Sequence, residues 1–188
     1  TLAPTFGVAH GAAWGPDDTI IVGGSVGGSP GLWRVPAAGG EPTVVTTKDA
    51  TRGEIGHWWP EVLPGGRAVL FTIVRGERFD TMEIAVLDLT TGEQRTLLPG
   101  GSRPRYAPSG HLIYGVGGRL MAVPFDRDRL ELGGTAVPVV EGVLTDPLVG
   151  LVEFDVSADG SLVYVAGANF GETQSLVWVD RQGREESI

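Results

Sequence analysis

The chain contains no cysteine among its 188 residues. Disulfide bonds, thiolate metal ligands and cysteine nucleophiles are therefore excluded. The sequence also lacks any apolar run close to the roughly 20 residues that a membrane-spanning helix needs, so no membrane insertion is expected. Basic residues are few: the chain has 14 Lys and Arg and 23 Asp and Glu, which gives a formal net charge of −9. A surface of this sign repels phosphate groups, so nucleic acid is not an expected partner.

Long helical stretches are missing as well. No window of a dozen residues is free of Gly and Pro while carrying apolar residues at three-and-four spacing, so we expect almost no α-helix. The 30 glycines and 13 prolines occur beside an apolar content of 41%, which is enough for a core and too high for a disordered chain. The length suits one domain. The sequence thus predicts a single all-β domain.

One unit occurs four times along the chain. Each copy has a short apolar strand, a tight turn rich in Gly, Pro and Asp, and then a β-branched or aliphatic run, as a β-hairpin requires. The last residues of successive turns are 48, 44 and 50 positions apart. The four turns are Trp14–Asp18, Val62–Gly66, Tyr106–Gly110 and Val156–Gly160.

Two further strands complete the unit. The third strands alternate with period 2 and are expected at Leu32–Val35, Met82–Asp88, Leu120–Val123 and Leu176–Asp180. Fourth strands are expected at Pro42–Thr46, Gln94–Leu98 and Ala136–Val140, and the last copy reaches Ile188 where its fourth strand should begin. Four strands in 44 to 50 residues are typical of a β-propeller blade. We therefore predict a partial β-propeller of about four antiparallel blades, within a single segment 1–188, with the last blade incomplete; the blade ranges are 8–50, 51–99, 100–143 and 144–188.

The repeat resembles the WD-like repeat of TolB-type propellers, in strings such as Tyr106–Gly110 and Val156–Gly160. Two strings, Gly118–Asp126 and Leu176–Gly183, are similar to the propeller behind the kinase domain of bacterial eukaryotic-like serine/threonine kinases. The resemblance implies a binding or sensing propeller in an extracytoplasmic or periplasmic location. The kinase motifs themselves are absent, so the chain is not expected to phosphorylate anything.

Propellers of this family usually close with six to eight blades, so four copies correspond to about half a ring. An open ring leaves sheet edges with unpaired backbone groups, which favour pairing with another chain. We therefore expect a homodimer that pairs through blade edges, or a segment of a longer propeller. A third interpretation is a scaffold whose exposed edges only assemble oligomers.

Two overlapping Gly-x-Ser-x-Gly strings, centred on Ser25 and Ser29, match the nucleophile elbow of α/β-hydrolases. An elbow needs a strand before the serine and a helix after it. Here another strand is expected to follow, so a Gly/Ser loop between two strands is the preferred interpretation. The alternative is a hydrolase, either an esterase that uses Ser25 or Ser29 or the propeller part of a peptidase.

The string His57-Trp58-Trp59-Pro60 lies on a predicted first strand, the strand nearest the central channel in a propeller. Equivalent positions in other copies include His10, Arg103 and Glu153. Convergence of His57, Trp58 and Trp59 with these three side chains would form a ligand or peptide site with aromatic faces and a few polar anchors. The competing interpretation is that Trp58 and Trp59 fill the gap between wide blades.

No metal or cofactor is expected. His10, His57 and His111 fall on different copies, and His111 is expected to face solvent. The run Asp126–Glu131 lacks the Gly and the final Glu of a calcium loop, so a charged hairpin tip explains it. The carboxylates of Glu54, Asp88, Asp155 and Asp180 are interpreted as turn and strand-end groups. The sequence as a whole favours a non-catalytic module that binds a protein or small-molecule ligand, over a hydrolase or a scaffold.

Overall fold

The computed structural model describes residues 6–26, 29–76, 81–146, 150–167, 176–180 and 182–187. The chain divides into two compact units, residues 1–104 and 105–188. The described residues contain no α-helix, and the single helical turn among them is the 3₁₀ turn η1, Ala50–Arg52. None of the described elements is a helix that could cross a membrane. The expectation of an all-β chain is confirmed.

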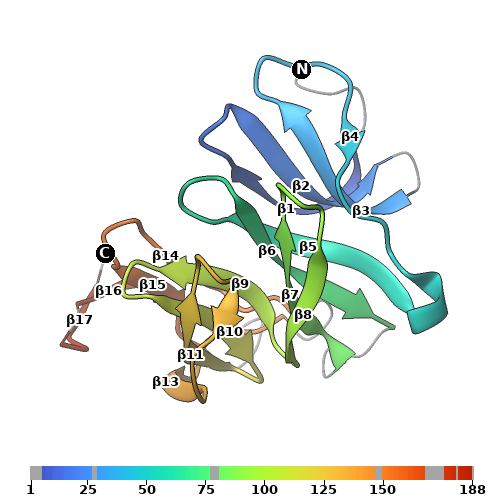
Figure 1. The fold of residues 1–188 in the computed structure, drawn as a ribbon. Coiled ribbons are helices and arrows are strands. Elements are labelled where there is room, and N and C mark those ends of the chain that lie inside the picture. Colours follow the sequence, from blue (N-terminus) through green and yellow to red (C-terminus); the bar gives the residue numbers. More distant parts are fainter. Residues whose placement is uncertain are drawn as a thin grey trace. The chain divides into compact units, whose positions relative to one another are not determined.

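Two four-stranded antiparallel sheets occupy the first unit, each with its strands in chain order (Figure 1). In both sheets a tight turn joins the first two strands, with Gly15 N–H donating to Thr19 O at 2.7 Å and Leu63 N–H donating to Ala68 O at 2.9 Å. The strands of the first sheet are β1 Phe6–Trp14, β2 Thr19–Val26, β3 Ser29–Pro36 and β4 Thr43–Val44. Those of the second are β5 Glu54–Val62, β6 Ala68–Arg75, β7 Glu83–Asp88 and β8 Gln94–Pro99.

The core of the first unit lies between these two sheets. Ile21 and Leu32 come from the first sheet, and both are fully buried against residues of β6 and β7. Phe71 on β6 is the largest of the fully buried side chains. A twisted sheet has two apolar faces to cover. The stacking of one blade on the next removes the two facing surfaces, one from each sheet, from water. The buried cluster is Ile21, Leu32, Val69, Phe71, Ile73, Ala85 and Leu87.

The remaining two sheets follow the same order, and the third gains a short extra strand at its edge. The expected hairpin tip at Asp126–Glu131 is confirmed, because Asp126 Oδ1 accepts the N–H groups of Asp128 and Arg129 at 2.9 and 3.0 Å. The strands of the third sheet are β9 Ser102–Ala107, β10 His111–Val116, β11 Arg119–Asp126, β12 Glu131–Leu132 and β13 Val137–Glu141. Those of the fourth are β14 Phe154–Val156, β15 Leu162–Val165, β16 Leu176–Val179 and β17 Glu185–Ser187.

The last sheet is more complete than the sequence indicated. β17 pairs antiparallel with β16, with Glu186 opposite Trp178. The fourth strand was expected to begin near residue 188, because Glu185 and Glu186 have low β-propensity and give no strand signal. Their pairing depends on the edge of β16, which supplies the backbone partners that the local sequence does not indicate.

The second unit has its own core between the third and fourth sheets. Leu120 and Ala122 on β11 pack against Val152 and Phe154, and all four are buried. A Cβ on Gly115 would lie 2.2 Å from Val152 Cγ2, so the two sheets approach closely where β10 carries a glycine. Four sheets of consecutive antiparallel strands, packed face to face in pairs, are blades of a β-propeller.

Candidate functional site

The two serines of the Gly-x-Ser-x-Gly strings lie on a β-hairpin and not in a loop. Ser25 is on β2 opposite Pro30, and Ser29 is on β3 opposite Val26; Gly27, Gly28 and both serine side chains lie outside what the structure describes. The expected Gly/Ser loop is therefore wrong for most of the string. An elbow needs a helix directly after the serine, and here strand follows strand.

The glycines of this string have a packing role. A Cβ on Gly23 would lie 2.9 Å from His57 O and 3.0 Å from His10 O, so only a glycine lets β2 approach both backbones. Gly23 is thus explained by the contact between the first two blades.

The conspicuous His57-Trp58-Trp59 string contains a β-bulge. Trp58 pairs with Thr72 of β6, but Glu61 pairs with Leu70, so β5 has one extra residue in this interval. Trp59 has a φ of +49°, a left-handed backbone conformation that is rare for a bulky residue. The bulge resets the alternation of the strand, which decides which side chains enter the core.

Trp58 and His10 form an aromatic pair across the first two blades. Their rings stack with centroids 3.9 Å apart and an interplanar angle of 23°. Both side chains are half-buried, whereas Trp59, which meets Trp58 edge-on at 5.5 Å, is 7% exposed. Of the predicted site residues, the structure brings these three together. Trp59 is buried, as expected for a side chain that fills the gap between blades, while Trp58 and His10 remain partly exposed to solvent.

His57 points into the interior, in contrast to the expected channel-facing position. Its exposed fraction is 0%, and its ring lies 5.0 Å from that of Phe71. Thr46 Oγ1 lies 2.6 Å from His57 Nδ1 and also accepts the N–H of Leu32 at 2.8 Å. The other ring nitrogen, Nε2, faces the Glu54 carboxylate, which only accepts, so the neutral ring carries its proton on Nε2 and the Thr46 hydroxyl donates to Nδ1. The imidazole links the two blades and has no exposed surface for a ligand to reach.

Glu54 completes this buried network from the first position of β5, so it is the strand-end carboxylate that the sequence indicated, although its burial was not expected. Its Oε2 accepts His57 Nε2–H at 3.2 Å and the N–H of Asp49 at 2.7 Å, while Arg75 donates to Oε1 at 3.4 Å. The exposed fraction of Glu54 is 4%. Asp88 and Asp180 also follow the expectation, because they accept N–H groups of the turns that follow them.

Burial lowers the pKa of His57 below its ordinary value of 6.5, and the hydrogen bond and charge of Glu54 oppose this shift without cancelling it. A neutral imidazole is what the Thr46 hydroxyl requires, since it donates to the unprotonated Nδ1.

This lowered pKa predicts a pH-dependent stability. The unfolded chain binds a proton at His57 more readily than the folded chain does. The contribution of the neutral His57 to the free energy of unfolding is therefore fully present above the ordinary pKa of 6.5, and it is lost as the pH falls toward the lower pKa of the folded state. We expect urea denaturation to show an extra loss of about 1 kcal/mol per pH unit in this window, absent from His57→Gln. Equal pH dependence in the two proteins would contradict the assignment.

Arg103 and Glu153 occupy different surroundings from the aromatic pair. Arg103 is the second residue of β9, with a φ of +50°, and its N–H donates to Thr72 Oγ1 at 3.0 Å. Thr72 is the β6 partner of Trp58, so the Arg103 backbone contacts the same sheet position. Glu153 belongs to the second unit, where its N–H donates to Leu144 O at 3.0 Å.

The three histidines have separate environments in the structure. His10 stacks on Trp58, His57 is buried, and His111 begins β10, where its Nδ1 lies 3.1 Å from Ser109 Oγ. His111 is half-buried, although the sequence indicated a solvent-facing position. Among the described residues, no three His, Cys, Asp or Glu side chains are grouped so that they could hold a metal ion.

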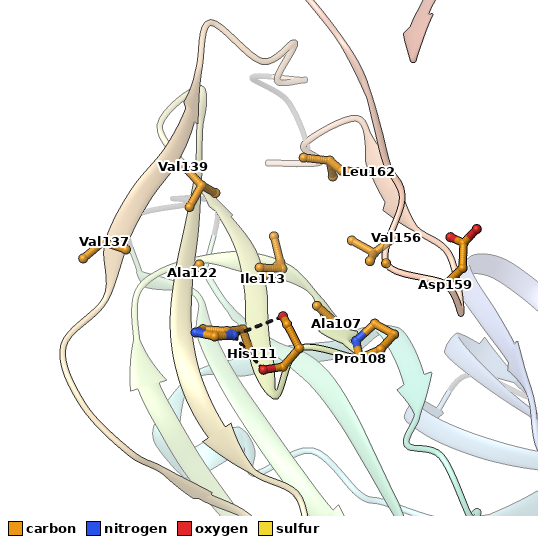
Figure 2. A pocket seen from close by; sticks show the side chains of 12 residues that line it. Ala107, Pro108, His111, Ile113, Ala122, Val137, Val139, Val156, Asp159 and Leu162 are labelled. Carbon is orange, nitrogen blue, oxygen red and sulfur yellow. Dashed lines mark hydrogen bonds between the residues drawn. The ribbon is translucent and has the colours of Figure 1, made fainter. Parts of the chain in front are cut away.

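A groove in the second unit was not predicted from the sequence. Figure 2 shows it between β10, β11 and β13 of the third sheet and the β14–β15 hairpin of the fourth. Its volume is about 630 Å³, within the range of small-molecule sites. The lining is mostly apolar, with Ser109, His111 and Asp159 as its polar side chains.

Comparisons with known proteins support the fold. No protein-family model and no curated protein matches the chain. Among solved structures, TolB from Acinetobacter baumannii matches with a TM-score of 0.66 and 20% identity, over 96% of this chain and 43% of that one. A putative TolB from Agrobacterium tumefaciens gives 0.69 and 17%, over 96% and 65%. A puromycin-hydrolyzing peptidase from Mycobacterium tuberculosis gives 0.64 and 16%, over 95% and 31%.

These likenesses define the class of protein as a β-propeller. More particularly, the chain has the fold of TolB-type propellers, as its repeat indicated. It spans less than two thirds of the length of either TolB structure. At these identities the comparison extends to the fold and no further.

Proposed function

We propose that this chain is a non-catalytic binding module, in which the His10–Trp58 pair contacts a peptide or small ligand. The observation behind it is a stacked, half-buried aromatic pair that joins the first strands of two blades. Beside it, Trp59 holds a left-handed backbone conformation, which is uncommon for a large side chain and is found most often at functional sites. Propellers suit binding because they hold many short loops and strand ends on a rigid frame.

The wider context follows from the resemblance of the repeat. We propose that the module is the sensing segment of a receptor-like protein, of the kind in which a propeller follows a kinase domain, in an extracytoplasmic location. Its partner along the sheet edges is the rest of a longer propeller or a second copy of the chain. TolB-type structures of greater length support the first arrangement, because this chain spans 43% of one and 65% of another.

The second candidate is the propeller part of a hydrolase. Structures titled puromycin hydrolase match 99% of this chain and only 32% of their own length, so the shared part is about a third of those proteins. The hairpin position of Ser25 and Ser29 favours a non-catalytic segment over an esterase within this chain.

Peptides selected from a random displayed library on the wild-type protein test the proposed function. Trp58→Ala is expected to weaken the selected peptides about 30-fold or more, because a central tryptophan commonly contributes 2 kcal/mol or more to binding. Trp14→Ala is the matched control, since Trp14 lies on β1, the strand that carries His10, but is 63% exposed at the end of that strand.

Equal binding by both variants would contradict the proposal. Turnover of a short-chain p-nitrophenyl ester that is lost in Ser25→Ala or Ser29→Ala would replace it with the hydrolase.

A further inference from the structure

The groove of the second unit has apolar walls from two blades. Ile113 and Ala122 line one side and are nearly buried, while Leu162 and Val156 line the other. Val137 and Val139 on β13 extend the first wall and are 53% and 50% exposed. Figure 2 shows these side chains around one hollow. Exposed valines on a concave surface lose contact with water when an apolar molecule binds, which favours binding.

Polar groups gather at one end of this groove. Ser109 and His111 come from the β9–β10 turn, and Asp159 comes from the β14–β15 turn. Both turns are the first turn of their blade, so the repeat places them at the same end of neighbouring sheets. A molecule in the groove therefore meets an apolar surface along its body and polar groups at one end.

Asp159 gives this end its charge. It is the one residue with a formal charge among the twelve that line the groove, His111 being counted as neutral. Its Oδ1 accepts the N–H of Ser161 at 2.9 Å and the hydroxyl of Ser157. These bonds hold the carboxylate in place at the β14–β15 turn.

The charge of the surrounding unit has the same sign. Residues 105–188 include six basic and twelve acidic side chains, for a net charge of −6, whereas residues 1–104 have a net charge of −3. An anion entering the groove would be repelled by Asp159 and by this excess. A cation would be attracted, and more strongly beside an apolar surface than in open water.

We propose that this groove binds a small apolar molecule that carries one protonated amine. The apolar body lies between Ile113 and Leu162, and the ammonium group donates hydrogen bonds to Asp159. The site is separate from the His10–Trp58 pair, so its failure would leave the proposed function standing.

Three probes with one skeleton test the proposal: 4-phenylbutylamine, 4-phenylbutanol and 4-phenylbutyrate. Binding is followed at about pH 8 by titration with NMR detection of the methyl groups of Ile113, Ala122 and Leu162. The amine is expected to bind about tenfold or more tightly than the alcohol, and the carboxylate most weakly. Shifts should be confined to groove methyl groups and unchanged by Trp58→Ala.

Two variants separate charge from shape. Asp159→Asn keeps an oxygen acceptor for Ser161 and should bring the amine to within about twofold of the alcohol. Asp128→Asn is its control, because it removes the same charge from the same unit at a side chain that is 91% exposed and outside the groove. Val139→Trp, at an exposed edge position, should weaken all three probes by filling the groove.

Several results would overturn the proposal. They are no saturable binding of any probe, equal affinity for amine and alcohol in the wild-type protein, tighter binding of the carboxylate, or equal effects of Asp159→Asn and Asp128→Asn.

Discussion

Glu54→Ala is expected to lower the free energy of unfolding by about 3 to 5 kcal/mol at neutral pH, as for other buried charge networks that lose one partner. The carboxylate accepts hydrogen bonds from Asp49 N–H, His57 Nε2–H and Arg75. Without it, the His57 N–H is buried with no acceptor, while Arg75 keeps its bond to Glu83 at 3.0 Å. Urea denaturation at about pH 7 measures the change.

Two controls identify the cause of this loss. Glu54→Gln keeps the side-chain carbonyl as an acceptor, so its cost should be smaller, about 1 to 2 kcal/mol. Glu83→Ala removes the more exposed partner of Arg75 and should cost about 1 kcal/mol or less. A Glu54→Ala protein within about 1 kcal/mol of the wild type would show that the network contributes little to the stability of the first unit.

Phe71→Ala should have an effect of similar size for a different reason. The ring is fully buried at the centre of the cluster that joins the first two blades, against Ile21, Leu32 and the His57 ring. Deleting a buried aromatic ring removes its transfer free energy and leaves a cavity, at a total cost of about 3 to 5 kcal/mol. The measurement is the midpoint and slope of urea unfolding.

Phe71→Leu separates packing volume from the specific ring contacts. It retains most of the apolar volume and should cost about 1 to 2 kcal/mol. If Phe71→Ala and Phe71→Leu proved equally stable, the cluster would have to rearrange around the missing ring, contrary to the close packing of the two sheets.

The buried network and the cluster together explain how one blade attaches to the next. Thr46 follows the last strand of the first sheet, and its hydroxyl bridges Leu32 and His57. Gly31 lies opposite, where a Cβ would be 2.2 Å from Thr46 O. The first unit therefore combines apolar stacking with a directional polar contact, and the latter specifies the register between the sheets. This contact fixes the position of Trp58 beside His10, the pair that we propose binds a ligand.

The strand order and turn positions of this protein were determined by the sequence alone. Turns such as Leu63–Gly66 and Ala107–Gly110 contain the proline and glycine that a tight hairpin needs, so their effect is local and visible in the chain. Repetition of such turns at nearly equal intervals then specifies a stack of similar sheets, because one sheet cannot cover both its faces. The absence of α-helix in the described residues follows from the same distribution of Gly and Pro.

Tertiary structure decided which side chains became buried and which stayed accessible. The alternation of buried and exposed side chains along His57-Trp58-Trp59 cannot be predicted from the sequence. The extra residue at Trp59 is a β-bulge, which is defined only by the pairing of β5 with β6. Glu54 and His57 are buried because Thr46, after β4, and Arg75, on β6, supply their hydrogen bonds. The groove likewise arises from residues such as Val139 and Leu162, which are distant in the chain and meet only when two blades pack together. Local propensity sets the strands, but burial depends on partners that the local sequence does not contain.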